Sequence, residues 1–463
     1  LFGADNADSL RGLYLDGVVL DEYADMKPSI WGAVLRPLLS DRRGWATFIG
    51  TPKGHNQFWE VYNNATKDPN WYCKTLRASQ TGLIPKEELE DAARSMTQDQ
   101  YLQEFECDFE SAIIGAYYGK EMRQLTDQGR ITNIDYDALE KLDKDRAGVI
   151  WGSGIGGLET FQIEVLNFAA GDGTPKFNPF FIPKMIGDIA CGHISIKYGF
   201  RGPNFGTVSA CASSTNAIID AFNYIRLGHA DVMVTGGSEA AVTIAGMGGF
   251  NAMHALSTRN DDPKTASRPM DKDRDGFVLG EGAGALILEE YEHAVARGAK
   301  IYCEIGGGGM SADAHHITAP HPEGLGARNV MLNCLRDAGL KPTDVDGVNM
   351  HGTSTPLGDL AESKAIEQVF GDHAYTMNLN STKSMTGHLL GAAGAIETIS
   401  SILSLKYGII PPTINHFTDD ENINSKLNFT FNVAQKRDVS VLMSNTFGFG
   451  GHNACVLVKK LDF

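Results

Sequence analysis

One cysteine and two histidines stand where an α/β protein commonly places its catalytic side chains. Cys211 lies in a run of small residues between an apolar strand and an amphipathic helix, so we expect it at the amino end of that helix. Unpaired N–H groups and the helix dipole stabilise a thiolate there and lower the pKa of the thiol. His351 ends an apolar strand, and His388 precedes a glycine- and alanine-rich helix. Together these residues predict a cysteine nucleophile that forms a covalent intermediate, with two imidazoles beside it.

The elements that must position these residues belong to an α/β protein. Short apolar strands that end in glycine turns alternate with helical stretches throughout the 463 residues. The composition changes near residue 135, because the earlier part is rich in Trp, Tyr, Arg and Asp and the later part in Gly and Ala. We therefore expect two domains, residues 1–135 and 136–463, in agreement with a length that predicts more than one core.

Charge and cysteine usage narrow the classes of function. A formal net charge of −17 disfavours a general binder of nucleic acid or of membrane surfaces, which needs a basic face. No apolar stretch is long enough to cross a membrane. The seven cysteines show no C-x-x-C spacing, which disfavours a disulfide framework and a zinc site. The sequence thus predicts a soluble protein of the reducing cytoplasm.

In the first domain, an apolar strand at 17–20 is followed at once by Asp21 and Glu22, and a second strand at 46–49 by the glycine turn 50–54. Two adjacent carboxylates after a strand can hold Mg²⁺ and orient a water molecule towards a phosphate. This order resembles the second half of the ATPase domain of phage terminase large subunits, which package DNA. The phosphate-binding pattern G-x-x-x-x-G-K-[ST] does not occur in the sequence. We therefore expect a partial P-loop NTPase-like α/β segment without its nucleotide-binding start.

Several motifs accompany the cysteine and the histidines in the second domain. They are Val208–Thr215, the turn from His351 through Gly-Thr-Ser-Thr-Pro, Lys383 with His388, the run Asn445–His452, and the stretches Leu256–Asn260 and Asp273–Glu281. From about Leu139 to Phe463 they resemble the β-ketoacyl-acyl carrier protein synthase family, closest to its type II members. The resemblance implies a thiolase-like layered αβαβα domain. The family's first strand, expected in the middle of the sheet of the amino-terminal half, is not found, so we expect the domain to lack it.

The resemblance implies a decarboxylative Claisen condensation that lengthens acyl chains in fatty acid biosynthesis. Cys211 would hold the acyl group as a thioester, and His351 and His388 would donate hydrogen bonds to the enolate formed when a malonyl group loses CO₂. The backbone N–H groups of Cys211 and Phe449 would form the oxyanion hole. The Phe449 side chain would gate the acyl pocket.

The resemblance also implies supporting and substrate-binding residues. Lys383 and Glu397 would set the charge and orientation around His388. Thr353 and Thr355 would bind the pantetheine arm of the substrate, and Ile155 would line the acyl pocket. The implied partners are an acyl carrier protein, loaded with acyl or malonyl groups, and a second copy of the chain in a homodimer.

Neither a cofactor nor a metal is expected. The glycine run 152–157 nearly matches a dinucleotide fingerprint, but no acidic residue ends a second strand about twenty residues later. His315 and His316 are adjacent, and neighbouring residues of a strand point to opposite faces.

Alternative functions remain for each part of the chain. A thiolase shares the expected fold but uses a second cysteine where this sequence has His388, which favours decarboxylative condensation. The remaining alternatives are a DNA-packaging ATPase fragment, which would make nucleic acid a partner, and an inactive join of two unrelated parts.

Overall fold

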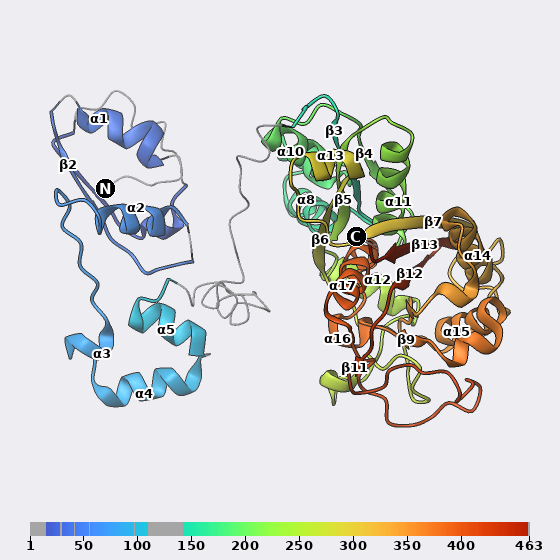
Figure 1. Ribbon diagram of the computed structural model, residues 1–463. Helices are drawn as coiled ribbons and strands as arrows, with labels where there is room; N and C mark the ends of the chain where they lie inside the picture. The colour runs from blue at the N-terminus through green and yellow to red at the C-terminus, as the bar shows by residue number, and fades with distance from the viewer. Residues whose placement is uncertain are drawn as a thin grey trace. The chain divides into compact units, whose positions relative to one another are not determined.

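The computed structural model describes residues 15–27, 30–40, 42–54, 56–96, 98–109 and 142–461. The chain divides into two compact units, Leu1–Ile134 and Asp135–Phe463 (Figure 1). The domain boundary expected at residue 135 lies outside the described residues. Among the described residues, no helix combines the length and the apolar character needed to cross a bilayer.

The first unit contains the two strands that the sequence predicts. β1 (Gly17–Leu20) pairs in parallel with β2 (Trp45–Phe48). A core of apolar side chains packs beside this pair, with Leu20, Tyr23 and Ile30 at most 3% exposed. The helices of this unit are α1 (Arg36–Ser40), α2 (Gln57–Ala65), α3 (Ala78–Thr81), α4 (Lys86–Ser95) and α5 (Gln98–Glu106), with a π-helical turn at Ile30–Leu35.

The second unit contains two mixed sheets. The strands of the first sheet, in spatial order, are β4 (Asn204–Thr207), β3 (Ala147–Gly152), β5 (Val232–Glu239) and β6 (Gly282–Glu289). Those of the second are β7 (Glu304–Ala312), β13 (His452–Lys459), β12 (Val441–Gly448), β8 (Gly347–Asn349) and β9 (Asn378–Asn380). In each sheet three strands are parallel and the next one, β6 or β13, is antiparallel to its neighbour. The two sheets therefore repeat one pattern.

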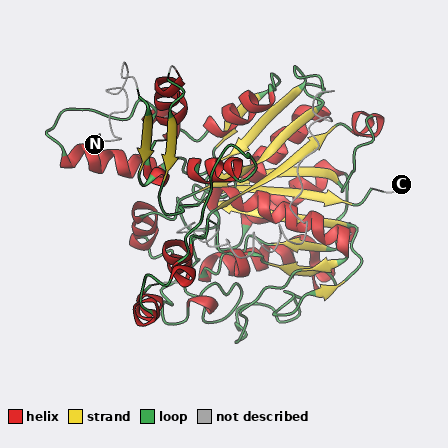
Figure 2. Ribbon diagram, turned by 90° about the vertical axis from the view of Figure 1, so that its left-hand side faces the viewer, coloured by secondary structure: helices red, strands yellow, loops and turns green. Residues whose placement is uncertain are grey.

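Helices fill the space between the sheets and cover their outer faces (Figure 2). Two helices contact strands of both sheets and form the middle layer, namely α11 (Ser213–Arg226) and α17 (Ala393–Tyr407). The first sheet is covered by α10 (Ile189–Tyr198), and the second by α14 (Leu325–Ala338), which packs against α15 (Pro356–Phe370). The remaining helices are α8 (Leu158–Ala170), α9 (Phe181–Met185), α12 (Ile244–Ala252), α13 (Tyr291–Ala296) and α16 (Lys383–Thr386). The short strands β10 (Ile409–Ile410) and β11 (Gln435–Lys436) pair antiparallel with each other. This is the expected αβαβα arrangement.

The expectation of a strand missing from the middle of the first sheet is wrong. β4, β3, β5 and β6 form one continuous ladder without a gap. Among the described strands, the first sheet has four members and the second five. The additional strand of the second sheet, β7, lies at an edge beside β13. The corresponding position in the first sheet is the outer edge of β6. A strand missing from that edge leaves the pairings among β4, β3, β5 and β6 intact.

Candidate active site

Cys211 lies in a tight turn between β4 and α11. The turn is closed by hydrogen bonds from the Ser209 N–H to Ser213 Oγ at 3.0 Å and from the Ala212 N–H to the Ser209 carbonyl at 3.0 Å. Ala210 has a φ of +51°, in the left-handed region that non-glycine residues seldom adopt. Such strain persists only where surrounding contacts fix it, and it is common beside functional groups. The strand-to-helix placement predicted from the sequence is thus confirmed, although α11 begins two residues after the cysteine, at Ser213.

The end of β12 approaches this turn from the other half of the domain. A Cβ atom added to Gly448 would lie 2.6 Å from the Ser209 carbonyl oxygen and 3.1 Å from the Cys211 nitrogen. Only glycine fits such an approach. Gly448 thereby brings Phe449 to the cysteine, and the backbone N–H of Phe449 stabilises the thiolate form.

Burial controls the pKa of the Cys211 thiol. The expected lowering by the helix start is not found, because burial raises the pKa of Cys211 to about 12 and outweighs the opposing effects of Lys383 and the Phe449 N–H. The residue is 8% exposed. The thiol is therefore protonated at neutral pH.

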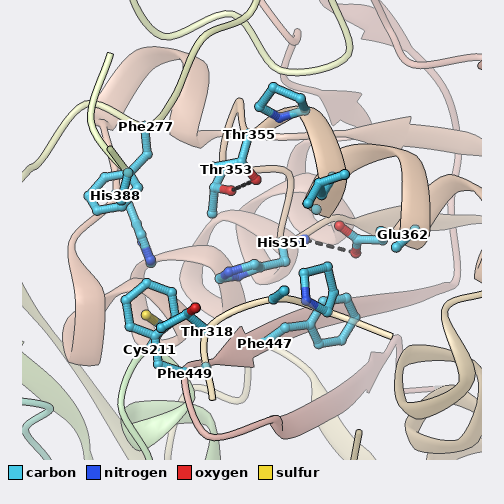
Figure 3. Close-up of a pocket in the computed structure, with 18 of the residues that line it drawn as sticks. Cys211, Phe277, Thr318, His351, Thr353, Thr355, Glu362, His388, Phe447 and Phe449 are labelled. Atoms are coloured by element: carbon cyan, nitrogen blue, oxygen red, sulfur yellow. Dashed lines mark hydrogen bonds between the residues drawn. The ribbon is translucent and has the colours of Figure 1, made fainter. Parts of the chain in front are cut away.

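His351 and His388 come from separate loops and meet in the interior. Their ring centroids are 5.2 Å apart and their planes are at 87°. Burial and the charge of Lys383 hold the pKa of each imidazole well below its usual range, so both rings are neutral at pH 7. Neither Nδ1 atom has a hydrogen-bond partner among the described residues. Figure 3 shows the two rings and Phe449 around Cys211.

Each histidine is held through its backbone. Glu362 on α15 accepts hydrogen bonds from the N–H groups of His351 and Gly352, both at 2.9 Å. The His388 N–H donates to the Val278 carbonyl at 2.7 Å, and the ring of Phe277 packs edge-on against the imidazole at 5.2 Å. The rings are therefore oriented by packing while their nitrogen atoms remain available.

Lys383 and Glu397 form an ion pair in the core. Lys383 is 1% exposed and Glu397 is 2% exposed. Burial raises the pKa of Glu397 to about 7, although the ammonium group opposes this shift. Neither residue lines the cavity described below. Their effect on the site is electrostatic, since the charge of Lys383 favours neutral imidazoles and a deprotonated Cys211.

A cavity of about 320 Å³ brings six of the predicted residues together. They are Cys211, His351, Thr353, Thr355, His388 and Phe449. The hydroxyl oxygens of Thr353 and Thr355 are 3.0 Å apart, so the pair presents polar groups on one wall (Figure 3). Apolar side chains make up much of the remaining wall, including Phe250, Phe277 and Phe447.

Besides Lys383 and Glu397, three more predicted residues lie outside the cavity. Ile155, in the loop after β3, is 43% exposed and does not line the cavity. Asp21 and Glu22 follow β1 in the first unit, and both are exposed. Nearby, Lys53 forms an ion pair with Asp25 at 2.7 Å.

The sequence analysis missed residues that the fold brings to the site. Thr318 and Phe250 line the cavity from loops and helices outside the motifs that it used. Glu362 was also missed. An acidic residue within the apolar stripe of a helix is a signal of a buried polar partner, and in α15 Glu362 is 2% exposed.

Comparisons with known proteins agree with this geometry. The models of the family described as beta-ketoacyl synthase match residues 133–294 with their N-terminal domain and residues 302–417 with their C-terminal domain. A protein named 3-oxoacyl-[acyl-carrier-protein] synthase 2 from Staphylococcus aureus is 52% identical over 318 residues, which cover 69% of this chain and 76% of that protein. A protein of the same name from a species of Synechocystis is 48% identical over 324 residues, 70% of this chain and 77% of that protein.

Solved structures show the same architecture. A beta-ketoacyl synthase from Burkholderia phymatum superimposes with a TM-score of 0.64 at 35% identity, over 73% of this chain and 79% of that chain. The complex AntDE:AntF, described as a type II PKS acyl-carrier protein with its ketosynthase bound to the hexaketide, gives a TM-score of 0.66 at 32% identity, over 70% of this chain and 80% of that chain.

Proposed function

The chain belongs to the beta-ketoacyl synthase family, and from this premise we propose that Cys211, His351 and His388 carry out its reaction. Its relatives at about 50% identity are named 3-oxoacyl-[acyl-carrier-protein] synthase 2. The chain is accordingly an acyl-transferring condensing enzyme of fatty acid biosynthesis. The observation that carries the residue assignment is the pair of neutral imidazoles on the wall of the cavity that contains the Cys211 thiol.

The first half-reaction is acyl transfer. The sulfur of Cys211 attacks the carbonyl carbon of an acyl thioester, and the carrier thiol leaves with the proton that the cysteine loses. The tetrahedral oxyanion accepts hydrogen bonds from the backbone N–H groups of Cys211 and Phe449. The proximity of the Phe449 N–H to the thiol supports this assignment.

The second half-reaction is decarboxylation followed by condensation. The malonyl group loses CO₂, and the electron pair of the broken C–C bond forms an enolate. Two neutral imidazoles can each donate one hydrogen bond to the enolate oxygen. The enolate carbon then attacks the acyl carbonyl, the C–S bond to Cys211 breaks, and the released thiolate takes up a proton. The product is a β-ketoacyl thioester that is two carbons longer.

The thioester substrates are proposed to be bound covalently to an acyl carrier protein. A ketosynthase complexed with an acyl-carrier protein is among the similar structures, which supports this type of partner. Thr353 and Thr355 are proposed to hydrogen-bond the pantetheine arm, because their hydroxyl groups face the cavity that leads to Cys211. Ile155 is proposed to contact the acyl chain.

We also propose a homodimer. β4 is an edge strand of the first sheet, and Val208 directly after it is 72% exposed. Helices α8 and α9 expose apolar side chains as well, among them Leu166 and Ile182. Sedimentation equilibrium would test the assembly.

The terminase-like interpretation of residues 1–135 stays a hypothesis, together with its nucleic-acid partner. The parallel pair of β1 and β2 with Asp21 and Glu22 directly after β1 supports it. ATP hydrolysis by the chain that is lost in Asp21→Ala would favour it.

A condensation assay tests the proposed function directly. The chain is incubated with acyl-carrier and malonyl-carrier, and the β-ketoacyl product and CO₂ are measured. Equal amounts of the two products are expected from the unchanged chain and neither from Cys211→Ala. Condensation by Cys211→Ala would overturn the assignment of the nucleophile.

A further inference from the structure

We propose that Glu239 is a positioning residue that joins two loops of the active site, the loop 153–157 after β3 and the loop 389–392 after His388. The inference rests on the proposed function, because it concerns the residues assigned to that reaction. Glu239 ends β5 and is 4% exposed. It does not line the cavity, so it acts on substrate only through other residues.

The carboxylate accepts three backbone hydrogen bonds from the two loops. Oε2 accepts from the Gly154 N–H at 2.8 Å and from the Gly391 N–H at 3.1 Å. Oε1 accepts from the Ile155 N–H at 3.2 Å. Burial raises the pKa of Glu239, and the converging N–H groups oppose this shift by stabilising the ionised carboxylate. A single side chain thus holds segments that are more than 230 residues apart in the sequence.

The two loops approach each other closely beside the carboxylate. A Cβ atom added to Gly391 would lie 2.3 Å from the Gly154 nitrogen and 2.7 Å from Glu239 Oε2. A Cβ atom added to Gly154 would lie 3.0 Å from the carbonyl oxygen of Ala210, the residue before the nucleophile. Two glycines therefore allow the carboxylate to sit where both loops meet the cysteine turn.

This junction fixes the positions of groups with assigned roles. Gly391 is three residues after His388, and Ile155 is proposed to contact the acyl chain. If the carboxylate no longer accepts these hydrogen bonds, both loops gain freedom, and the enolate-binding imidazole moves relative to Cys211. Displacements of about 1 Å at a reacting centre are sufficient to lower a rate by about 10²-fold.

The same carboxylate acts on the nucleophile through its charge. Glu239 raises the pKa of Cys211, Lys383 opposes it, and the neighbouring His351 and His388 are neutral. Glu239→Gln keeps the shape of the side chain but removes the charge and one acceptor. It is therefore expected to make Cys211 more reactive towards a small alkylating agent and, at the same time, to make condensation slower. Because a loosened fold would also expose the buried thiol, Gly391→Ala, which keeps the charge of Glu239, shows how much of any gain in reactivity comes from exposure alone.

Three variants of the full chain separate these effects. Glu239→Gln changes charge and hydrogen bonding. Gly391→Ala forces the loops apart without changing charge. Glu290→Gln is the matched control, because Glu290 also accepts a backbone hydrogen bond, from His293 at 2.8 Å, but this bond lies at the amino end of its own helix, α13, and not in either loop.

The first measurement is alkylation of Cys211 by iodoacetamide between pH 6 and 9, followed by peptide mapping. Glu239→Gln is expected to react at least about twofold faster at each pH, since more thiolate is present. Gly391→Ala and Glu290→Gln should follow the pH profile of the unchanged chain. The second measurement is hydrogen exchange of the peptides that contain 153–157 and 389–392, which should quicken in Glu239→Gln and Gly391→Ala but not in the control.

The third measurement is condensation. Glu239→Gln and Gly391→Ala are expected to lose about tenfold or more in kcat with little change in KM for malonyl-carrier. Unchanged exchange in both loops together with an unchanged kcat in Glu239→Gln would overturn the proposal. If the unchanged chain does not condense at all, the proposed function fails, whereas alkylation and hydrogen exchange still decide the role of Glu239. If Glu239→Gln does not fold, Gly391→Ala decides it.

Discussion

His351 and His388 place their imidazole rings 5.2 Å apart and nearly perpendicular, in a region where burial and Lys383 keep both uncharged. A neutral imidazole donates one hydrogen bond and accepts another, whereas the charged form only donates. Two neutral rings can therefore share one enolate oxygen without placing two positive charges in the core. This relationship is the basis of the first two predictions.

Replacing His388 by Ala should separate the two half-reactions. Acyl transfer onto Cys211 is expected to stay within a few-fold of the unchanged chain, because no enolate forms in that step. Malonyl decarboxylation is expected to fall by about 10²–10³-fold, as for the loss of one oxyanion donor. Mass spectrometry of the acylated Cys211 peptide and release of labelled CO₂ measure the two steps. An equal loss in both would contradict the division of roles.

Removing the charge of Lys383 should shift the acid limb of the pH–rate profile. Lys383 lowers the pKa of both imidazoles, so Lys383→Met raises these pKa values. Activity that needs neutral rings is lost as the pH falls through the pKa values of the two imidazoles. The loss should therefore begin at a higher pH in Lys383→Met than in the unchanged chain. Lys383→Arg keeps the charge and is the control. An acid limb at the same pH in Lys383→Met would refute this explanation.

The same change should also lower stability. Lys383→Met leaves Glu397 buried without its partner, which costs about 3–5 kcal/mol in comparable pairs. Replacing both residues, as in Lys383→Met with Glu397→Gln, should restore much of the free energy of unfolding. Urea denaturation measures each variant, and a double variant no more stable than the single one would show that the pair is not the cause.

The two threonine hydroxyls should contribute to substrate binding rather than to chemistry. Thr353→Val with Thr355→Val removes two hydrogen-bonding groups of about 1 kcal/mol each, so KM for the carrier-bound substrate should rise by about tenfold or more with kcat nearly unchanged. Thr376→Val is a suitable control, because Thr376 bonds only to the exposed turn at His373. A fall in kcat at constant KM would argue against binding of the pantetheine arm.

Acylation by the carrier should modify Cys211 alone among the seven cysteines. Cys73 is exposed and will react with small alkylating agents, but it lies outside the cavity that holds the imidazoles and the Phe449 N–H. Peptide mapping after incubation with acyl-carrier is the measurement, with Cys73→Ala as the control that retains full labelling. Acyl groups on another cysteine would contradict the assigned nucleophile.

The residues that the sequence predicts best are those at strand ends. Cys211 after β4 and His351 after β8 follow from a local pattern of apolar residues, small residues and turns, and the topology then brings them together. The layered arrangement of two similar sheets likewise agrees with the expectation. Local patterns suffice where a side chain is positioned by its own strand and helix.

Long-range partners could not be predicted in this way. Glu239 is recognisable only when the Gly154 and Gly391 N–H groups are seen to converge on it. The pKa of Cys211 depends on how completely the folded chain encloses the thiol, so burial reversed the shift that the helix start suggested. The prediction that the family's first strand belongs in the middle of the first sheet was wrong for a similar reason. Strand order within a sheet depends on pairings between distant strands, which the sequence of a single strand does not encode.

The close contact between Gly448 and the Cys211 turn has a consequence for how activity arises. The nucleophile belongs to the first half of the duplicated domain, whereas both imidazoles and Phe449 belong to the second half. Each half alone possesses only part of the chemistry. Catalytic competence therefore depends on the association of the two halves, since a partly folded chain with only the first half formed would have the thiol without either imidazole.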